Sequence, residues 1–266
     1  SKRVCSERGD VMRMRLIYTG RILLILTVSA PRISAEVFHW QIDGEMREAI
    51  IYASVSEDSE NGRPLVLAFH GYGDNMENFQ HTNVHGAWRN AIVVYPQGLN
   101  RRGGLRGWQV EVGDGDRDLR FVDEILTYLR ESYRVDENRI YATGFSNGGM
   151  FAYLLWAERP DVFAAYAPVG ARLRPSVKPN RPRPIFHVAG ERDQVVRFAD
   201  QKTAIEVAVQ VNGVGASKEG CGLGCAVYGS KSDAPVMTWI HSGAHVYPRG
   251  TSERIVSFFR DHSRTP

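Results

Sequence analysis

The residues of this chain that are best suited to chemistry form one short run, Gly144-Phe145-Ser146-Asn147-Gly148, which is a G-x-S-x-G motif. Such a serine acts as a nucleophile when it sits on a sharp turn between a strand and a helix, because its hydroxyl then projects above a sheet. Strand and helix nearly touch at that turn, so the positions two before and two after the serine must be small. The alternative interpretation is a glycine-rich turn with an incidental serine.

The sequence on either side of Ser146 predicts the strand and the helix that this turn requires. Residues 139–143 are mostly apolar and follow the turn residues Asp136 and Asn138, which is typical of a short buried strand. After the serine, apolar residues recur at helical spacing until Arg159-Pro160 ends the helix. The order strand, serine, helix therefore favours a nucleophile over an incidental serine.

A serine hydroxyl is a weak nucleophile unless a base takes its proton and an acid orients that base. On a sheet of this kind the acid and the histidine follow the serine in that order, each on a loop after a later strand. The predicted strand 185–189 is followed by a loop that contains Asp193. The predicted strand 236–240 is followed by a loop that contains His245. The sequence thus supplies a Ser, acid, His order.

Two choices remain within these loops. Asp193 is favoured as the acid because it lies a short loop past its strand, whereas Glu191 is nearer the strand end and Asp200 is predicted to be an N-cap. His241 directly abuts its strand, while His245 follows a Gly-containing turn that could present it over the serine. The spacing favours His245 and leaves His241 open.

The oxyanion of a tetrahedral intermediate needs two N–H donors. The backbone N–H of the residue after the nucleophile, Asn147, is one candidate. His70-Gly71-Tyr72-Gly73 follows the predicted strand 65–69, and its glycines allow the backbone to turn toward the site, so the N–H of Tyr72 is the second candidate. Loss of one such donor typically costs about 3 kcal/mol of transition-state stabilisation.

The elements that must position these residues alternate between strand and helix. A hairpin is predicted around Asp43-Gly44, followed by a helix that Asp118 caps. Further strands are predicted at 65–69, 91–95, 139–143, 163–169, 185–189 and 236–240, with later helices near 200–211 and 252–260. This alternation predicts an α/β fold with a mostly parallel central sheet and helices on both faces, which places the site at the carboxyl ends of the strands.

The first 35 of the 266 residues have the three parts of a secretory signal peptide. Met14 starts a basic region, an apolar run covers residues 22–28, and Ala35 offers a small residue before the cleavage point. The run is too short to span a bilayer, so a retained anchor is the lesser alternative. We therefore expect a leader over residues 1–35, one catalytic domain over 36–266, and a secreted or periplasmic protein without a stable membrane anchor.

The charge of the chain depends on that leader. Of 33 Lys/Arg and 30 Asp/Glu residues, the leader contains seven and two, so the remainder keeps 26 and 28 and its formal charge changes from +3 to about −2. The basic isoelectric point therefore indicates no nucleic-acid partner. Outside the leader, Cys221 and Cys225 favour a disulfide over two free thiols in an exported chain. They make a poor zinc site because no histidine is near them, and no metal or cofactor is expected.

Several runs resemble the secreted esterase family that contains polyhydroxybutyrate depolymerases and bacterial feruloyl and acetylxylan esterases. The similarity covers essentially the whole mature chain. The matching runs are His70-Gly71-Tyr72-Gly73-Asp74, Tyr95-Pro96-Gln97-Gly98, Gly144 to Met150, Phe163-Ala164-Ala165, Ala189 to Val196 and Gly243 to Pro248.

The resemblance implies an α/β-hydrolase fold with Ser146, Asp193 and His245 as the catalytic triad. It also implies that Trp108 lies near the substrate cleft, although a core tryptophan is an equally good interpretation, and we assign His70 to substrate binding beside it. Ala244 and Tyr247 stand where the family usually has Gly and Trp. These departures affect the cleft walls, and so the choice of substrate, more than the triad.

The main hypothesis is a secreted serine esterase that acts through an acyl-enzyme, without cofactor or metal, on small or oligomeric esters. Feruloyl or acetyl side groups of plant polysaccharide are the favoured substrates, and polyhydroxyalkanoate oligomers are the alternative. An acyltransferase and a peptidase share the same triad. A non-catalytic binding protein on a hydrolase scaffold is the hypothesis from a different class, and such proteins generally lose a triad residue. The oligomeric state is left open.

Overall fold

The computed structural model describes residues 17–19, 22–24, 33–54, 62–101 and 103–264. Contacts along the chain divide it into two units, Ser1–Arg32 and Ile33–Pro266. In the first unit β1 (Ile17–Thr19) pairs with β2 (Ile22–Leu24) in an antiparallel manner. Apart from these two strands, residues 1–32 of the expected leader, including Met14, lie outside the described residues.

The second unit begins three residues before the expected domain boundary. Ile33, Ser34 and Ala35 form the first part of β3 (Ile33–Ile42), which pairs along its whole length with β4 (Glu45–Ser54). The predicted hairpin turn lies between these two strands. Asp43 and Gly44 both have positive φ there, 51° and 83°, which matches the two-residue turn that twisted strands prefer.

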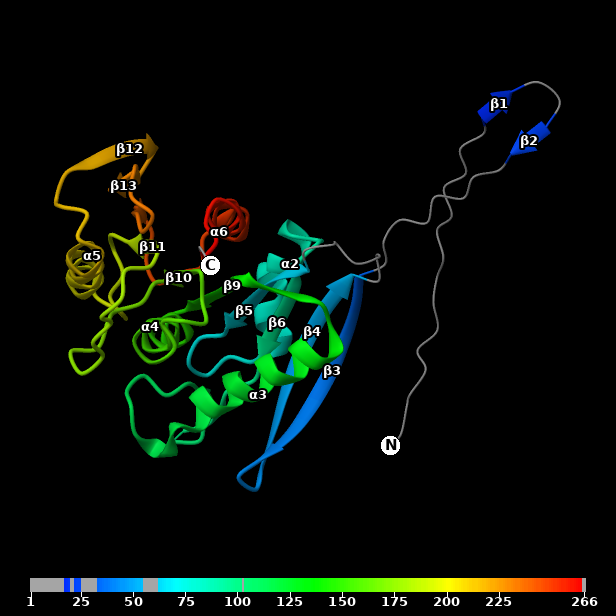
Figure 1. Ribbon diagram of the computed structural model, residues 1–266. Helices are drawn as coiled ribbons and strands as arrows, with labels where there is room; N and C mark the ends of the chain where they lie inside the picture. Colours follow the sequence, from blue (N-terminus) through cyan, green and yellow to red (C-terminus); the bar gives the residue numbers. More distant parts are fainter. Residues whose placement is uncertain (1–16, 20–21, 25–32, 55–61, 102, 265–266) are drawn as a thin grey trace. The chain divides into compact units, whose positions relative to one another are not determined.

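The core of the second unit is a ten-stranded sheet (Figure 1). Its order is β12-β13-β14-β11-β10-β9-β5-β6-β4-β3. The six central strands, β14 to β6, run parallel, and an antiparallel hairpin extends the sheet at each end. The parallel strands are β5 (Arg63–Phe69), β6 (Ile92–Pro96), β9 (Val135–Phe145), β10 (Ala165–Val169), β11 (Ile185–Gly190) and β14 (Val236–His241).

Helices cover both faces of the sheet, so each face has its own apolar core. One core contains side chains of α3 (Arg117–Ser132), α4 (Asn147–Glu158) and α5 (Phe198–Asn212). The other contains side chains of α1 (Met76–Phe79), α2 (Val84–Ala87) and α6 (Thr251–Arg260). The predicted α/β class with a mostly parallel sheet is confirmed. Short elements complete the unit: η1 (Gln80–Thr82), η2 (Asp114–Asp116) and the pair β7 (Leu99–Asn100) and β8 (Arg106–Gly107).

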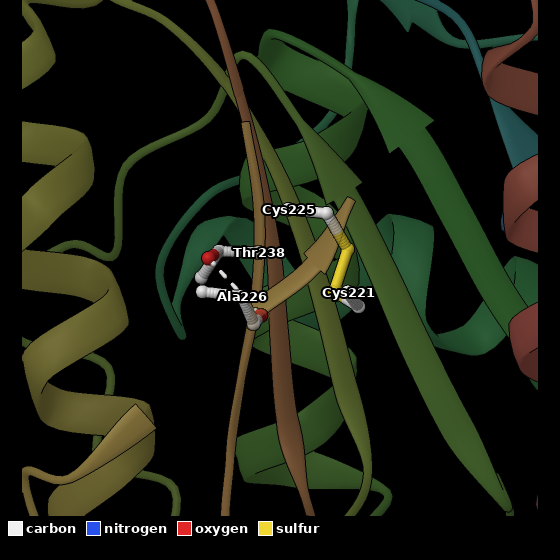
Figure 2. Close-up of a disulfide and its surroundings, with 4 residues drawn as sticks. All are labelled: Cys221, Cys225, Ala226 and Thr238. Atoms are coloured by element: carbon white, nitrogen blue, oxygen red, sulfur yellow. Dashed lines mark hydrogen bonds between the residues drawn. A yellow bond between two sulfur atoms is a disulfide. The ribbon is translucent and has the colours of Figure 1, made fainter. Parts of the chain in front are cut away.

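One hairpin was not predicted from the sequence. Residues 213–232 include β12 (Lys218–Gly222) and β13 (Cys225–Tyr228), whose side chains are exposed or half-buried and so lack a buried apolar face. The predicted disulfide is confirmed. Cys221 and Cys225 are bonded across the turn, and Thr238 of β14 donates to the carbonyl of Ala226 beside them (Figure 2).

Two predicted helix caps are wrong. Asp116 is the N-cap of α3, and Asp118 lies inside the first turn, where its carboxylate turns inward to Arg47 at 2.9 Å. Arg197 is the N-cap of α5, and Asp200 lies in the first turn and pairs with Arg197 at 3.2 Å. An acid in the first turn also stabilises the positive end of the helix dipole, so both positions give the same sequence signal.

Candidate active site

Ser146 occupies the turn between β9 and α4 in a strained conformation. Its φ is 54° and its ψ is −114°, a combination outside the regions that L-residues favour. Such a residue costs of order 1–3 kcal/mol and persists only where its surroundings enforce it. Its N–H donates to Val169 O of the neighbouring strand at 2.8 Å, which fixes the turn to the sheet edge.

The two glycines of the motif are required by close backbone contacts. A Cβ on Gly144 would lie 2.5 Å from the carbonyl carbon of Gly148. A Cβ on Gly148 would overlap the carbonyl oxygens of Phe69 and His70 at the end of β5. Strand, helix and the neighbouring loop therefore meet without side chains at this point, and the interpretation of the run as a mere glycine-rich loop leaves these contacts unexplained.

Asp193 and His245 meet at the same edge of the sheet, after β11 and β14. His245 Nδ1 lies 2.7 Å from Asp193 Oδ2, and because the carboxylate can only accept, the proton is on Nδ1 and Nε2 is left free as a base. Asp193 is 3% exposed. Its other oxygen, Oδ1, accepts the N–H groups of Val195 and Val196, each at 2.9 Å.

The alternative acid and base residues have other surroundings. Glu191 is exposed, and Asp200 pairs with Arg197 on the surface of α5. His241 Nδ1 accepts the N–H of Gly243 at 3.1 Å, so that nitrogen is bound to its own loop. Burial lowers the pKa of His241. Of the predicted candidates, the structure brings together Asp193 and His245.

His245 and Ser146 share the same neighbours. The rings of His245 and Phe145 have centroids 4.8 Å apart, and Phe145 directly precedes the serine. A Cβ placed on Gly170 would lie 3.5 Å from the His245 ring, and Val169 before it accepts the Ser146 N–H. Among the described residues Ser146 has no hydrogen bond to His245. In serine hydrolases this contact is often long before substrate binds.

The two candidate oxyanion donors flank the serine. A Cβ placed on Gly71 would lie 3.7 Å from the Cβ of Ser146, so the loop that carries Tyr72 passes directly beside it. Asn147 is the first residue of α4, where a helix leaves its N–H groups unpaired. Neither the Tyr72 N–H nor the Asn147 N–H has an acceptor within the described part of the chain.

His70 stabilises this loop from within. It is fully buried, its Nδ1 donates to Gly71 O at 2.7 Å, and its Nε2 accepts the N–H of Gly98 at 3.0 Å. Burial lowers the pKa of His70, which favours the neutral ring that these two bonds require. The predicted assignment of His70 to substrate binding is therefore replaced by a structural role, because the buried ring presents no surface to a substrate.

Trp108 is a core residue, not a cleft residue. Its side chain is fully buried, stacks on Phe151 with ring centroids 5.4 Å apart, and donates from Nε1 to His70 O at 2.9 Å. Of the two interpretations of this tryptophan, the structure thus favours the core. Its backbone, however, contacts Asn147, the residue after Ser146.

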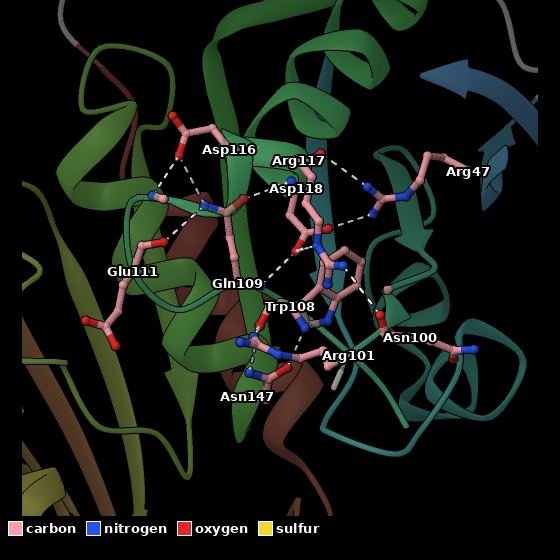
Figure 3. Close-up of polar contacts among 12 residues, drawn as sticks. Arg47, Asn100, Arg101, Trp108, Gln109, Glu111, Asp116, Arg117, Asp118 and Asn147 are labelled. Carbon is pink, nitrogen blue, oxygen red and sulfur yellow. Dashed lines mark hydrogen bonds and ion pairs between the residues drawn. The ribbon is translucent and has the colours of Figure 1, made fainter. Parts of the chain in front are cut away.

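The side chain of Asn147 is bound to the backbone of Trp108 in both directions. Asn147 Oδ1 accepts the Trp108 N–H at 2.6 Å, and Nδ2 donates to Trp108 O at 3.1 Å. The next residue, Gln109, exchanges two hydrogen bonds with Asp118, at 2.6 and 2.9 Å. Asp118 in turn pairs with Arg47 of β4, and both side chains are buried (Figure 3). We call these five residues the Asn147 clamp.

Sequence reasoning missed the clamp and the partner of Asp193 on α5. Gln201 Nε2 donates to Asp193 Oδ2 at 3.0 Å, and Gln201 is fully buried. A glutamine on the apolar face of a predicted helix was the available signal. Within the described ranges no three His, Cys, Asp or Glu side chains gather as a metal-binding set. The helices of those ranges are also too short or too polar to cross a bilayer.

Comparison with known proteins places these observations in a family context. Residues 90–173 match the model of the prolyl oligopeptidase family. They include the turn at Ser146 between β9 and α4, which we call the elbow. A bifunctional acetylxylan esterase/xylanase of Neocallimastix patriciarum is 35% identical over 142 residues, which are 51% of this chain and 20% of that protein. Feruloyl esterase C of Emericella nidulans is 27% identical over 219 residues, 77% of each chain. The chain is thus similar in sequence to proteins named as esterases.

A poly(3-hydroxyalkanoate) depolymerase C of Paucimonas lemoignei is 24% identical over 172 residues, 62% of this chain and 41% of that protein. The predicted resemblance to this group of esterases and depolymerases is thus confirmed. The chain spans less than half the length of two of the three relatives named here.

Solved structures agree on the fold. The acetyl xylan esterase from Aspergillus awamori superposes with a TM-score of 0.65 at 13% identity, covering 85% of this chain and 99% of that one. A thermostable esterase superposes with a TM-score of 0.64 at 18% identity, covering 86% of this chain and 63% of that one. The fold is the α/β-hydrolase fold.

Proposed function

We propose that this protein is a serine esterase that hydrolyses carboxylic esters through an acyl-enzyme. The observation that carries the proposal is the strained Ser146 elbow at the same sheet edge as the 2.7 Å hydrogen bond between His245 and Asp193. A strained serine beside a histidine with a fixed tautomer is what general-base activation needs. The esterase names of the relatives support the same reaction class.

In the proposed mechanism each of these residues has one role. His245 Nε2 takes the Ser146 proton as Oγ attacks the ester carbonyl, and the negative oxygen accepts from the Tyr72 and Asn147 N–H groups. Collapse of the tetrahedral intermediate expels the alcohol, which takes the proton from His245. Water then attacks the acyl-enzyme, with His245 again as the base, and releases the carboxylic acid and free Ser146. Asp193 keeps the imidazole in the Nδ1–H tautomer throughout.

For the substrate we propose feruloyl or acetyl side-group esters of plant polysaccharide. We propose that the protein acts on them outside the cell or in the periplasm. The relatives named as acetylxylan and feruloyl esterases support this choice. The Cys221–Cys225 disulfide supports an oxidising compartment. Polyhydroxyalkanoate oligomers are the second candidate, which the depolymerase relative supports.

The test compares purified wild type with Ser146→Ala on p-nitrophenyl acetate, methyl ferulate, acetylated xylan, hydroxybutyrate oligomers and a p-nitroanilide amide. We expect Ser146→Ala to lower kcat at least about 10³-fold, because the nucleophile is removed. Ser257→Ala, an exposed serine of α6, is the matched control and should retain full activity. Equal turnover by wild type and Ser146→Ala would refute the proposal. A preference for the amide would move the protein to the peptidases.

A further inference from the structure

Three buried polar side chains that the proposed mechanism does not use form a line ending at Asp193. Tyr153 of α4, His187 of β11 and Gln201 of α5 are each at most 1% exposed. The Tyr153 hydroxyl lies 2.7 Å from His187 Nδ1, and His187 Nε2 lies 3.4 Å from Gln201 Oε1. Gln201 Nε2 then lies 3.0 Å from Asp193 Oδ2. We call these three residues and Asp193 the Asp193 relay.

The donor of each hydrogen bond in the relay can be assigned by starting from the Asp193 end. Gln201 Nε2 donates to Asp193 Oδ2 and also to Val196 O at 2.7 Å, so both of its protons are used and its oxygen must accept. His187 therefore carries its proton on Nε2, which leaves Nδ1 to accept the hydroxyl of Tyr153. All the donors thus point toward the carboxylate, an arrangement in which each hydrogen bond polarises the next.

His187 and Tyr153 are both uncharged, which is the favourable state for buried side chains. Burial lowers the pKa of His187 to about 4, so the ring is uncharged at neutral pH. Burial also raises the pKa of Tyr153, so the phenol keeps its proton. The relay therefore delivers donors to Asp193 without placing a second charge in the core.

Gln201 holds Asp193 in a way that the loop of the acid cannot. The N–H groups of Val195 and Val196 bind Oδ1 from within the same loop. They make no contact with Oδ2, so they do not fix the position of that oxygen relative to the rest of the protein. Gln201 binds Oδ2, the oxygen that also accepts from His245, and does so from a separate helix. Within the described residues it is the one side chain besides His245 that reaches this carboxylate.

We propose that Gln201 is a positioning residue of the active site, which holds Asp193 Oδ2 in line with His245 and is itself oriented by His187 and Tyr153. The inference rests on the proposed function for its effect on rate. Its geometric part, the alignment of the bond between Asp193 and His245, can be tested without any substrate.

The experiment uses Gln201→Met, which keeps the length and volume of the side chain and removes the donor. Gln210→Met is the matched control, because Gln210 is an exposed glutamine of the same helix. We expect Gln201→Met to lower kcat for p-nitrophenyl acetate about 10- to 100-fold with KM changed less than about threefold, since the binding surface is untouched. The low-field proton resonance of His245 Nδ1–H should shift or broaden, whereas Gln210→Met should match wild type in both measurements.

Tyr153→Phe is the second variant, because it keeps the ring and removes one hydroxyl at the far end of the relay. We expect a smaller fall of kcat, about two- to fivefold, with a shift of the same resonance. The inference is overturned if folded Gln201→Met keeps both the wild-type kcat and the wild-type resonance, or if Gln210→Met loses as much. Should Gln201→Met not fold, an unchanged kcat and resonance in Tyr153→Phe would overturn it instead.

Failure of the proposed function is distinguishable from failure of this inference. A wild type that hydrolyses none of the esters would refute the esterase proposal. The resonance would still differ between wild type and Gln201→Met if the positioning role is correct, because it reports on the hydrogen bond between Asp193 and His245 and not on turnover.

Discussion

The Asn147 clamp and the Asp193 relay both support the site from buried positions, yet they are built from different groups. The clamp ends in an ion pair, Arg47 with Asp118, whose side chains are 1% and 0% exposed. The relay consists of a phenol, a neutral imidazole and an amide, and its only charge is the carboxylate of Asp193. One assembly binds Asn147, the residue after Ser146, and the other binds Asp193.

The difference in charge determines how each assembly responds when one of its residues loses its partner. A buried ion that loses its partner keeps its desolvation cost and gains nothing in return. Burial already lowers the pKa of Arg47, which reflects that cost, and its Nε has no partner within the described chain. A neutral group that loses a partner leaves only an unsatisfied dipole. The clamp should therefore fail mainly in stability, and the relay mainly in the alignment of the acid.

The largest expected effect is on the clamp. Asp118→Ala should lower the free energy of unfolding by about 3–5 kcal/mol, because Arg47 is left as an unpaired buried charge and the N–H of Gln109 loses its acceptor. Denaturant unfolding measures the change. Asp123→Ala on the same helix is the control, since Asp123 is half-exposed and pairs with Arg159 at the surface, where a salt bridge contributes at most about 1 kcal/mol.

A double variant separates charge from packing in this result. Arg47→Met with Asp118→Leu removes both charges, so it should be more stable than Asp118→Ala alone. Arg47 Nη1 also donates to Arg117 O at 3.2 Å. If the double variant is as unstable as the single one, this hydrogen bond and those between Asp118 and Gln109 carry the stability of the clamp, and the contrast in charge is wrong.

The next effect concerns pH and belongs to the relay. His187 has a folded pKa of about 4 against an ordinary value of 6.5, so below pH 6.5 the unfolded state binds the proton first. Its contribution to stability is present above pH 6.5 and is lost as the pH falls toward 4. The loss should be about 3 kcal/mol at pH 4, because a pKa that differs by one between the folded and unfolded states corresponds to about 1.4 kcal/mol.

The measurement is the free energy of unfolding at pH 7 and pH 4 for wild type and for His187→Gln. Carboxylates titrate in the same window in both proteins, so the contribution of His187 is the difference between the two pH dependences. If the free energy of unfolding changes equally with pH in wild type and in His187→Gln, burial does not lower the pKa of His187. The neutral character assigned to the relay would then be wrong.

Much of this architecture was predictable because it leaves local signals. The G-x-S-x-G run predicts the elbow, since only glycine fits where Gly148 meets the carbonyl oxygens of β5. Continuous apolar runs predict the parallel strands, which are buried on both faces. Asp193 and His245 follow from their places after two such strands, and whether they act with Ser146 in catalysis stays a prediction.

The supporting groups were not predictable, because their partners are distant in sequence. Asp118 is indistinguishable from an N-cap until Arg47, 71 residues earlier, is seen beside it. Gln201 occupies a core-facing position of α5, and nothing near it in sequence marks the carboxylate it binds. Trp108 shows the limit of the resemblance, which implied a position near the cleft and left a core position equally possible, whereas the ring packs in the core.

The smallest effect tests whether the clamp acts on catalysis at all. Asn147→Ala keeps the backbone N–H proposed as an oxyanion donor and removes the two hydrogen bonds that hold Trp108. We expect the free energy of unfolding to fall by about 1–2 kcal/mol, because the buried N–H of Trp108 loses its acceptor and Trp108 O keeps only the donor from Arg101. We expect kcat to fall about tenfold at similar KM, since the donor loses its fixed direction. Steady-state kinetics on p-nitrophenyl acetate with parallel unfolding would show it. A loss of stability with an unchanged kcat would confine the clamp to the fold, and the relay would then be the one assembly of the two that acts on the chemistry.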